Sequence, residues 1–169
     1  EIDDLESLFL NDIPLIDTRA PVEFNKGSLP LASNLPLMID EEREAVGICY
    51  QQKGQAAALR LGHKLVNGEL KAERLNQWIH FSQQHPNGAL FCFRGGLRSE
   101  ITQSWLKEKG IDYPRVRGGY KAMRRWLIDA VERTCTRTPI LLLGGKTGSA
   151  KTRVLNEGFL GNPIKGSID

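Results

Sequence analysis

The chain has few cysteines and no long apolar run, and these two absences set the first limits on its function. Its three cysteines, Cys49, Cys92 and Cys135, are an odd number without CxxC spacing. They predict neither a disulfide framework nor a zinc site, and they fit a reducing cytoplasm. No apolar segment reaches the roughly 18 residues of a membrane span, and the sequence shows no apolar h-region of a secretory signal. We therefore expect a cytoplasmic protein with no membrane partner.

Catalytic histidine and metal-ligand patterns are also missing. The three histidines, at 63, 80 and 85, lie in or beside polar helical segments. They show neither metal-ligand spacing nor a Ser–His–Asp arrangement. We predict no metal bound by these side chains and no tightly bound cofactor.

Short apolar segments alternate with helical patterns along the chain. Strands are expected at 15–16, 32–35, 89–91, 114–116 and 139–143, and helices at 2–9, 21–26, 40–53, 56–66, 70–81, 99–109 and 120–131. Such alternation predicts an α/β fold with a mainly parallel sheet and helices on both faces. Ligands are then expected at the carboxyl ends of the strands.

The same pattern predicts two domains. The first spans residues 1–131 and contains an expanded helical stretch at 40–84. A linker is expected at 132–138, and residues 139–169 are predicted to be the incomplete start of a second α/β domain. We therefore expect the chain to be the front part of a longer protein.

The segment after the strand at 89–91 carries the first candidate site. Cys92 ends that strand, two glycines follow, and Arg98 comes six positions after the cysteine. A loop of this kind turns N–H groups inward, and the start of the next helix adds its positive dipole end. That field favours the thiolate of Cys92, which is the nucleophilic form. The predicted anion-binding loop consists of Phe93, Arg94, Gly95, Gly96, Leu97, Arg98 and Ser99.

A second candidate site follows the apolar segment 139–143. The residues Gly145, Lys146, Thr147, Gly148, Ser149, Ala150, Lys151 and Thr152 match the phosphate-loop pattern G-x-x-x-x-G-K-[ST], with alanine in place of the second glycine. Backbone N–H groups would surround a phosphate, Lys151 would reach its oxygens and Thr152 would bind Mg²⁺. Alanine keeps the N–H group but tolerates positive φ less well than glycine.

Basic residues are concentrated in the second part of the chain. The net charge is +3, yet residues 1–50 carry 3 basic and 11 acidic side chains, whereas Arg94 to Arg153 carry 14 basic and 5 acidic ones. This asymmetry makes a polyanion such as RNA a plausible partner. The contact candidates are Arg115, Arg117, Lys121, Arg124 and Arg125.

The order of these segments resembles that of rhodanese-like domains. Asp17-Thr18-Arg19, Asn34-Leu35-Pro36, the Cys92 loop and Arg117-Gly118-Gly119-Tyr120 follow one another over residues 12–131. The resemblance implies sulfur or selenium transfer through Cys92. Asp17 and Arg19 would then brace the active end of the sheet.

A narrower resemblance is to the bacterial tRNA 2-selenouridine synthases. It rests on the segments 14–24, 40–50, 93–99 and 118–121 together with the phosphate loop at 145–152. The resemblance implies that sulfur in wobble 2-thiouridine of tRNA is replaced by selenium from selenophosphate, after a geranyl group from geranyl diphosphate is attached to that sulfur. Cys92 would carry selenium as a selanyl group. The phosphate loop would hold the diphosphate of the prenyl donor or a nucleotide.

Two other interpretations of the same residues are open. Cys92 and Arg98 satisfy the C-x5-R spacing of cysteine-dependent phosphatases, although Phe91 stands where those enzymes usually place histidine. A regulatory rhodanese-like module would bind an anion without catalysis. Aryl phosphate hydrolysis distinguishes the phosphatase from the transferase.

Overall fold

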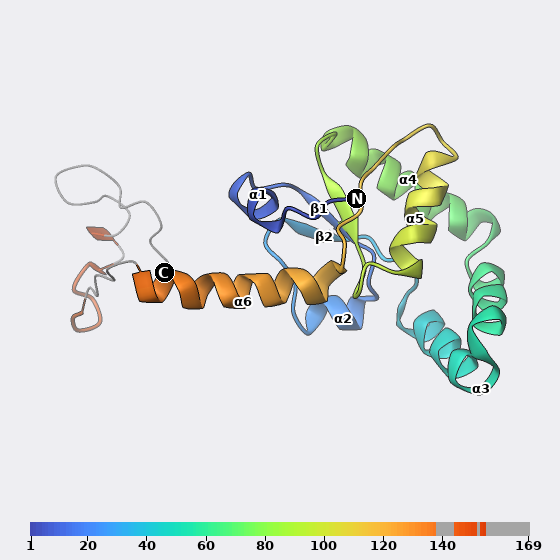
Figure 1. Cartoon of the computed structure of the whole chain (residues 1–169), viewed down its shortest axis with the longest axis horizontal. Helices are drawn as coiled ribbons and strands as arrows, with labels where there is room; N and C mark the ends of the chain where they lie inside the picture. Colours follow the sequence, from blue (N-terminus) through green and yellow to red (C-terminus); the bar gives the residue numbers. More distant parts are fainter. Residues whose placement is uncertain (138–143, 152, 155–169) are drawn as a thin grey trace. The chain divides into compact units, whose positions relative to one another are not determined.

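The computed structural model describes residues 1–137, 144–151 and 153–154 (Figure 1). Two compact units divide the chain at Ala130 and Val131. The elements are α1 (Leu5–Leu10), β1 (Leu15–Asp17), α2 (Pro21–Asn25), β2 (Ala32–Asn34), α3 (Asp40–Leu65), α4 (Gly68–Gln84), β3 (Ala89–Phe91), α5 (Leu97–Lys107) and α6 (Gly119–Arg137).

The first unit contains a three-stranded parallel sheet in the order β2-β1-β3. Ile16 of β1 lies opposite Ser33 of β2 and Leu90 of β3. Since all three strands run in the same direction, their carboxyl ends meet at one edge. That edge carries Asp17, Asn34 and the residue after β3, which is Cys92.

The alternation of side chains along the strands divides the core into two layers. Ile16 and Leu90 face a cluster that includes Trp78 of α4 and Trp105 of α5. Leu15 and Phe91 face the other way, into a cluster with Leu8 of α1 and Met123 of α6. Helices therefore cover both faces of the sheet, and the predicted α/β fold is confirmed.

The expanded helical stretch is a bent helix followed by a straight one. Helix α3 runs from Asp40 to Leu65, but Gly54 has φ +77° and divides it into two halves. Only glycine adopts this conformation at little cost, so the predicted break at Gly54 is confirmed. Asn67 precedes α4, which presents Leu75, Trp78 and Phe81 to the core.

Several predicted boundaries differ from the structure, among them that of the first helix, which spans Leu5–Leu10 instead of 2–9 because Ile2 pairs with Val116. Residues 114–116 form isolated bridges rather than a strand, since Pro114 has no N–H and the chain turns at Gly118. Helix α5 begins at Leu97, where Glu100 N–H already bonds Gly96 O, instead of at Ser99. Helix α6 continues to Arg137, so most of the predicted linker is helical. The sequence has no glycine or proline between Gly119 and Pro139 that would end the helix earlier.

The predicted strand at 139–143 lies outside the described residues. Within the described ranges, no helix is both long and apolar enough to cross a membrane.

Candidate active site at the Cys92 loop

Cys92 lies at the carboxyl edge of the sheet, where β3 ends. Its side chain is only 3% exposed. Residues 93–96 lead directly from it into α5. The backbone on the other side of the loop fixes its start, because Tyr120 N–H donates to Cys92 O at 2.9 Å and Lys121 N–H donates to Phe93 O at 3.0 Å. The loop and the first turn of α6 therefore form one hydrogen-bonded unit.

Glycines allow this close approach of two backbones. Gly119 has φ +57°, and a Cβ atom there would lie 2.1 Å from Cys92 O and 2.6 Å from Gly95 N. Gly95 has φ +68° and lies against the backbone of Gly118 in the same way. Any side chain at Gly119 would push the cysteine loop away from α6.

A hydroxyl group lies beside the thiol. The Sγ atom of Cys92 is 3.3 Å from Oγ of buried Ser99, and 3.7 Å from Gly96 O. The Ser99 hydroxyl also lies 2.8 Å from Gly96 O, to which it donates. Ser99 sits in the first turn of α5, so a thiolate at Cys92 would compete with Gly96 O for the single hydroxyl hydrogen and would meet the positive end of a helix dipole.

The structure places Arg98 against a carboxylate. Arg98 donates to Glu23 at 2.5 and 3.1 Å, and Arg43 lies 3.1 Å from the same carboxylate. Burial favours the neutral form of Glu23, but the hydrogen bonds and charge of Arg98 hold the pKa of Glu23 below its ordinary value. Burial opposes the charge of Arg98 too, and Glu23 nevertheless raises the Arg98 pKa. Arg98 of the predicted anion-binding loop is thus a guanidinium already paired with an acid.

Asp17 and Arg19 are buried at the same edge and brace it. Arg19 Nη2 donates to Asp17 Oδ2 at 2.6 Å and to Gly27 O at 2.9 Å. The guanidinium lies 3.7 Å from the centre of the Tyr120 ring, which adds a cation–π contact. The Asn34 amide donates to the carbonyls of Asp17 and Arg19. These contacts tie the ends of β1 and β2 to the start of α6.

Comparisons with known proteins identify relatives of the chain. The chain is 58% identical to a tRNA 2-selenouridine synthase of Marinobacter nauticus over 97% of its own length and 44% of that protein. It is also 58% identical to those of Photobacterium profundum, over 96% and 44%, and of Bordetella bronchiseptica, over 91% and 42%. The chain is homologous to tRNA 2-selenouridine synthases. It spans less than half the length of these relatives, and it matches no protein-family model.

A solved structure shares the fold. The N-terminal domain of a Clostridium difficile 630 protein described as ATP/GTP binding superposes with a TM-score of 0.68 at 28% identity. The match covers 75% of this chain and 98% of that domain. The similarity to tRNA 2-selenouridine synthases favours the transferase interpretation of the Cys92 loop over the phosphatase interpretation.

The predicted RNA contacts of this synthase homologue fall into two groups. Arg115 pairs with Glu1 and Glu100, and Arg117 pairs with Glu1 and Asp3. These two arginines stabilise the N-terminal segment, which lowers their availability for phosphates. The other three candidates line a hollow of about 750 Å³, which we call the basic groove; its lining includes Phe93, Arg94, Tyr120, Lys121, Arg124 and Arg125.

The described part of the phosphate loop, 145–151, lies in the second unit. Lys151 Nζ donates to the carbonyls of Gly145 and Lys146 at 3.0 Å each. Ala150 has φ +58°, the conformation for which the usual glycine is suited. Thr152, the predicted Mg²⁺ ligand, lies outside the described residues. Elsewhere in the described ranges, no group of three or more His, Cys, Asp or Glu side chains could hold a metal.

Two residues of the site escaped prediction from the sequence. Glu23 lies in the helix after β1 and was recognised only as part of a motif, although it holds Arg98. Tyr120 contacts both Arg19 and Phe93. A short polar motif cannot reveal such partners, because they meet only when β1 and β3 are placed side by side.

Proposed function

We propose that this chain is the selenium-handling part of an enzyme that replaces sulfur by selenium in wobble 2-thiouridine of tRNA. The observation that carries the proposal is the environment of Cys92. Backbone hydrogen bonds from α6 hold the start of its loop, and its sulfur contacts Ser99 at the start of α5. Similarity to tRNA 2-selenouridine synthases along 97% of the chain supports it. The reaction would take place in the cytoplasm, where tRNA is modified.

Selenophosphate is the donor that the loop would bind. Arg94 and Arg98 both belong to the loop, and Arg94 is exposed, so an anion bound there would meet two guanidinium groups. Arg98 would bind the anion while sharing its charge with Glu23. Geranyl diphosphate or a nucleotide with Mg²⁺ would occupy the phosphate loop at 145–152, where Lys151 would exchange its two carbonyl partners for phosphate oxygens.

The overall exchange is redox-neutral. Water takes the phosphoryl group of selenophosphate, selenium forms a bond to C2 of S-geranyl-2-thiouridine, and the C2–S bond breaks so that geranylthiol leaves. A selanyl group on Cys92 is two electrons more oxidised than a thiol plus selenide. Its formation therefore consumes a low-molecular-weight disulfide, and its release as selenouridine consumes two thiols.

The basic groove is the surface that would meet tRNA. Phe93 and Tyr120, whose ring centroids are 6.1 Å apart, line it together with Lys121, Arg124 and Arg125. Aromatic faces stack unpaired bases, and cations contact the phosphates on either side. Phe93 is the residue after Cys92, so a base stacked there would lie at the reactive loop.

The first test is the intact mass of the chain after incubation with selenophosphate and a glutathione redox buffer. A selenium-sized increment in the wild type and in Cys49→Ser with Cys135→Ser, absent from Cys92→Ser, would support Cys92 as the carrier. An unloaded, folded wild type would contradict it. Release of phosphate from an aryl phosphate by the wild type, lost in Cys92→Ser, would instead establish the phosphatase interpretation.

A further inference from the structure

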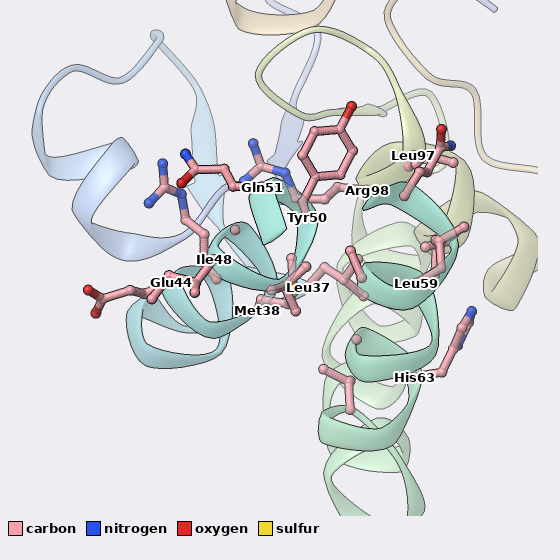
Figure 2. Close-up of a pocket in the computed structure, with 18 of the residues that line it drawn as sticks. Leu37, Met38, Glu44, Ile48, Tyr50, Gln51, Leu59, His63, Leu97 and Arg98 are labelled. Carbon is pink, nitrogen blue, oxygen red and sulfur yellow. The ribbon is translucent and has the colours of Figure 1, made fainter. Parts of the chain in front are cut away.

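An apolar cavity adjoins the Cys92 loop on the side of α3. Its volume is about 560 Å³, within the range of small-molecule sites. The kink at Gly54 makes it possible, since the two halves of α3 diverge there and form two of its walls (Figure 2). Leu37 and Met38 lie between them (Figure 2), and Leu97 and Ile101 of α5 also line the cavity.

The rim of this cavity exposes large apolar side chains. Ile48 is 48% exposed, Tyr50 57% and Leu97 41%, and all three line the cavity. Leaving such side chains in water costs free energy that packing elsewhere must offset, and a cluster of them around one hollow marks a binding surface. The hydrophobic core does not need them, because α3 buries only Ala58 fully.

The charges around the cavity are already balanced. Arg43 and Arg98 are the arginines of its lining and both pair with Glu23, while Glu44 of the lining adds a second carboxylate. A ligand with an anionic head would have to compete with that carboxylate for each arginine. A neutral hydrocarbon needs no such exchange, so the lining favours an uncharged apolar chain over a prenyl diphosphate.

The cavity and the thiol share one short segment. Leu97 and Arg98 line the cavity, and the next residue, Ser99, contacts the sulfur of Cys92. Only the first turn of α5 separates the cavity from the Cys92 sulfur. A ligand whose hydrocarbon chain occupies the cavity could therefore place its reactive group at Cys92.

We propose that this cavity holds the geranyl chain of S-geranyl-2-thiouridine, a role that rests on the proposed function. As selenium bonds to C2, the C2–S bond breaks, the electron pair leaves with sulfur, and a proton from water yields geranylthiol. The departing hydrocarbon must therefore lie next to the selenium carrier, and the cavity is the apolar space that the Cys92 loop borders. Binding of the chain would orient the C2–S bond and hold the leaving group away from water.

The test follows the cavity methyl groups by NMR in the ¹³C-methyl-labelled chain. The probe is the nucleoside S-geranyl-2-thiouridine, with S-methyl-2-thiouridine and geranyl diphosphate in parallel. We expect the geranyl nucleoside to shift the methyls of Val46, Leu59 and Ile101, which line the cavity, and to leave those of Leu127 in place. Its affinity should exceed that of each other probe at least tenfold.

Two variants test the cavity itself. Ala58→Leu fills it, and its matched control Ala56→Leu makes the same change two residues earlier, at an exposed position outside the lining. Ile48→Asn alters an exposed lining residue, where folding is tolerant. We expect Ala58→Leu and Ile48→Asn to weaken geranyl nucleoside binding at least fivefold and Ala56→Leu to leave it unchanged.

Several outcomes overturn the proposal. Equal shifts with the S-methyl nucleoside would remove the role of the chain, and tighter binding of geranyl diphosphate would assign the cavity to the prenyl donor. If no cavity methyl shifts, the cavity does not bind the geranyl chain, and a protein segment would be its occupant. Each result is independent of selenium loading on Cys92, so failure here and failure of the proposed function are distinguishable.

Discussion

Arg98 and Glu23 lie 75 residues apart in the chain, yet the Arg98 guanidinium donates two hydrogen bonds to the Glu23 carboxylate, at 2.5 and 3.1 Å. Glu23 belongs to α2, after β1, and Arg98 to the first turn of α5, after β3. The pair therefore joins the two chain segments that leave the active edge of the sheet. It also lowers the positive charge that an incoming anion meets at the loop, because the Glu23 carboxylate partly neutralises Arg98.

Glu23→Gln should destabilise the chain in a pH-dependent way. The folded-state pKa of Glu23 lies below its ordinary value of 4.5, so the carboxylate contributes stability above that pH and loses it as pH falls through the folded value. We expect the variant to lose about 1–3 kcal/mol of unfolding free energy at pH 7. Urea titrations at several pH values measure the difference between variant and wild type. That difference should shrink below pH 4.5, and a constant difference would contradict the role of the charge.

Gly119→Ala should disrupt the cysteine loop more than positive φ alone explains. Gly110 is the matched control, because it has φ +78° and a Cβ atom there would meet nothing within 4 Å, whereas a Cβ atom at Gly119 would lie 2.1 Å from Cys92 O. Gly110→Ala should cost about 1–2 kcal/mol, because alanine is strained in left-handed backbone. Gly119→Ala should cost about 3 kcal/mol or more. Thermal and urea unfolding give both values, and equal losses would show that loop contact does not matter.

Ser99→Ala should slow the reaction of Cys92 with iodoacetamide. The Ser99 hydroxyl, 3.3 Å from the sulfur, can turn from Gly96 O toward a thiolate, and loss of one such hydrogen bond, about 1 kcal/mol, should slow labelling about fivefold. Peptide mass mapping after timed labelling follows Cys92 separately from Cys49 and Cys135. Ser104→Ala, at an exposed position in the same helix, is the control and should leave the rate unchanged. Similar rates in all three proteins would remove Ser99 from the site.

The sequence predicted the positions of the strands and of the reactive loop, because local patterns determine both. Ala89–Phe91 is an apolar triplet before a glycine-rich turn. Gly54 interrupts a helical pattern with a positive φ that glycine adopts at little cost. The parallel order of the sheet followed from helices between strands. These features depend on residues close together in the chain.

The partners of the charged residues could not be predicted in the same way. Arg98 pairs with a carboxylate from α2, and Arg115 and Arg117 pair with Glu1 and Asp3, and none of these acids lies near its arginine in the sequence. The cavity beside α3 depends on how far the halves of that helix diverge at Gly54. Contacts of this kind are set by tertiary packing, which a single sequence does not specify.

Charge reversal in the basic groove should weaken RNA binding selectively. Lys121 and Arg124 line the groove beside Phe93 and Tyr120 and are exposed. A tRNA anticodon stem-loop whose phosphates they contact should bind Lys121→Glu and Arg124→Glu more weakly. The slope of log affinity against log salt concentration should fall by about 1 for each lost phosphate contact.

Lys53→Glu is the matched control for these reversals. Lys53 is exposed in α3 and lies outside the groove, so its reversal changes the net charge by the same amount without removing a contact. Fluorescence anisotropy at several salt concentrations measures affinity and slope together. If Lys53→Glu lowers both as much as Arg124→Glu does, RNA is attracted by net charge alone. If only the groove variants change the slope, phosphates are bound at the surface that also presents the base to Cys92.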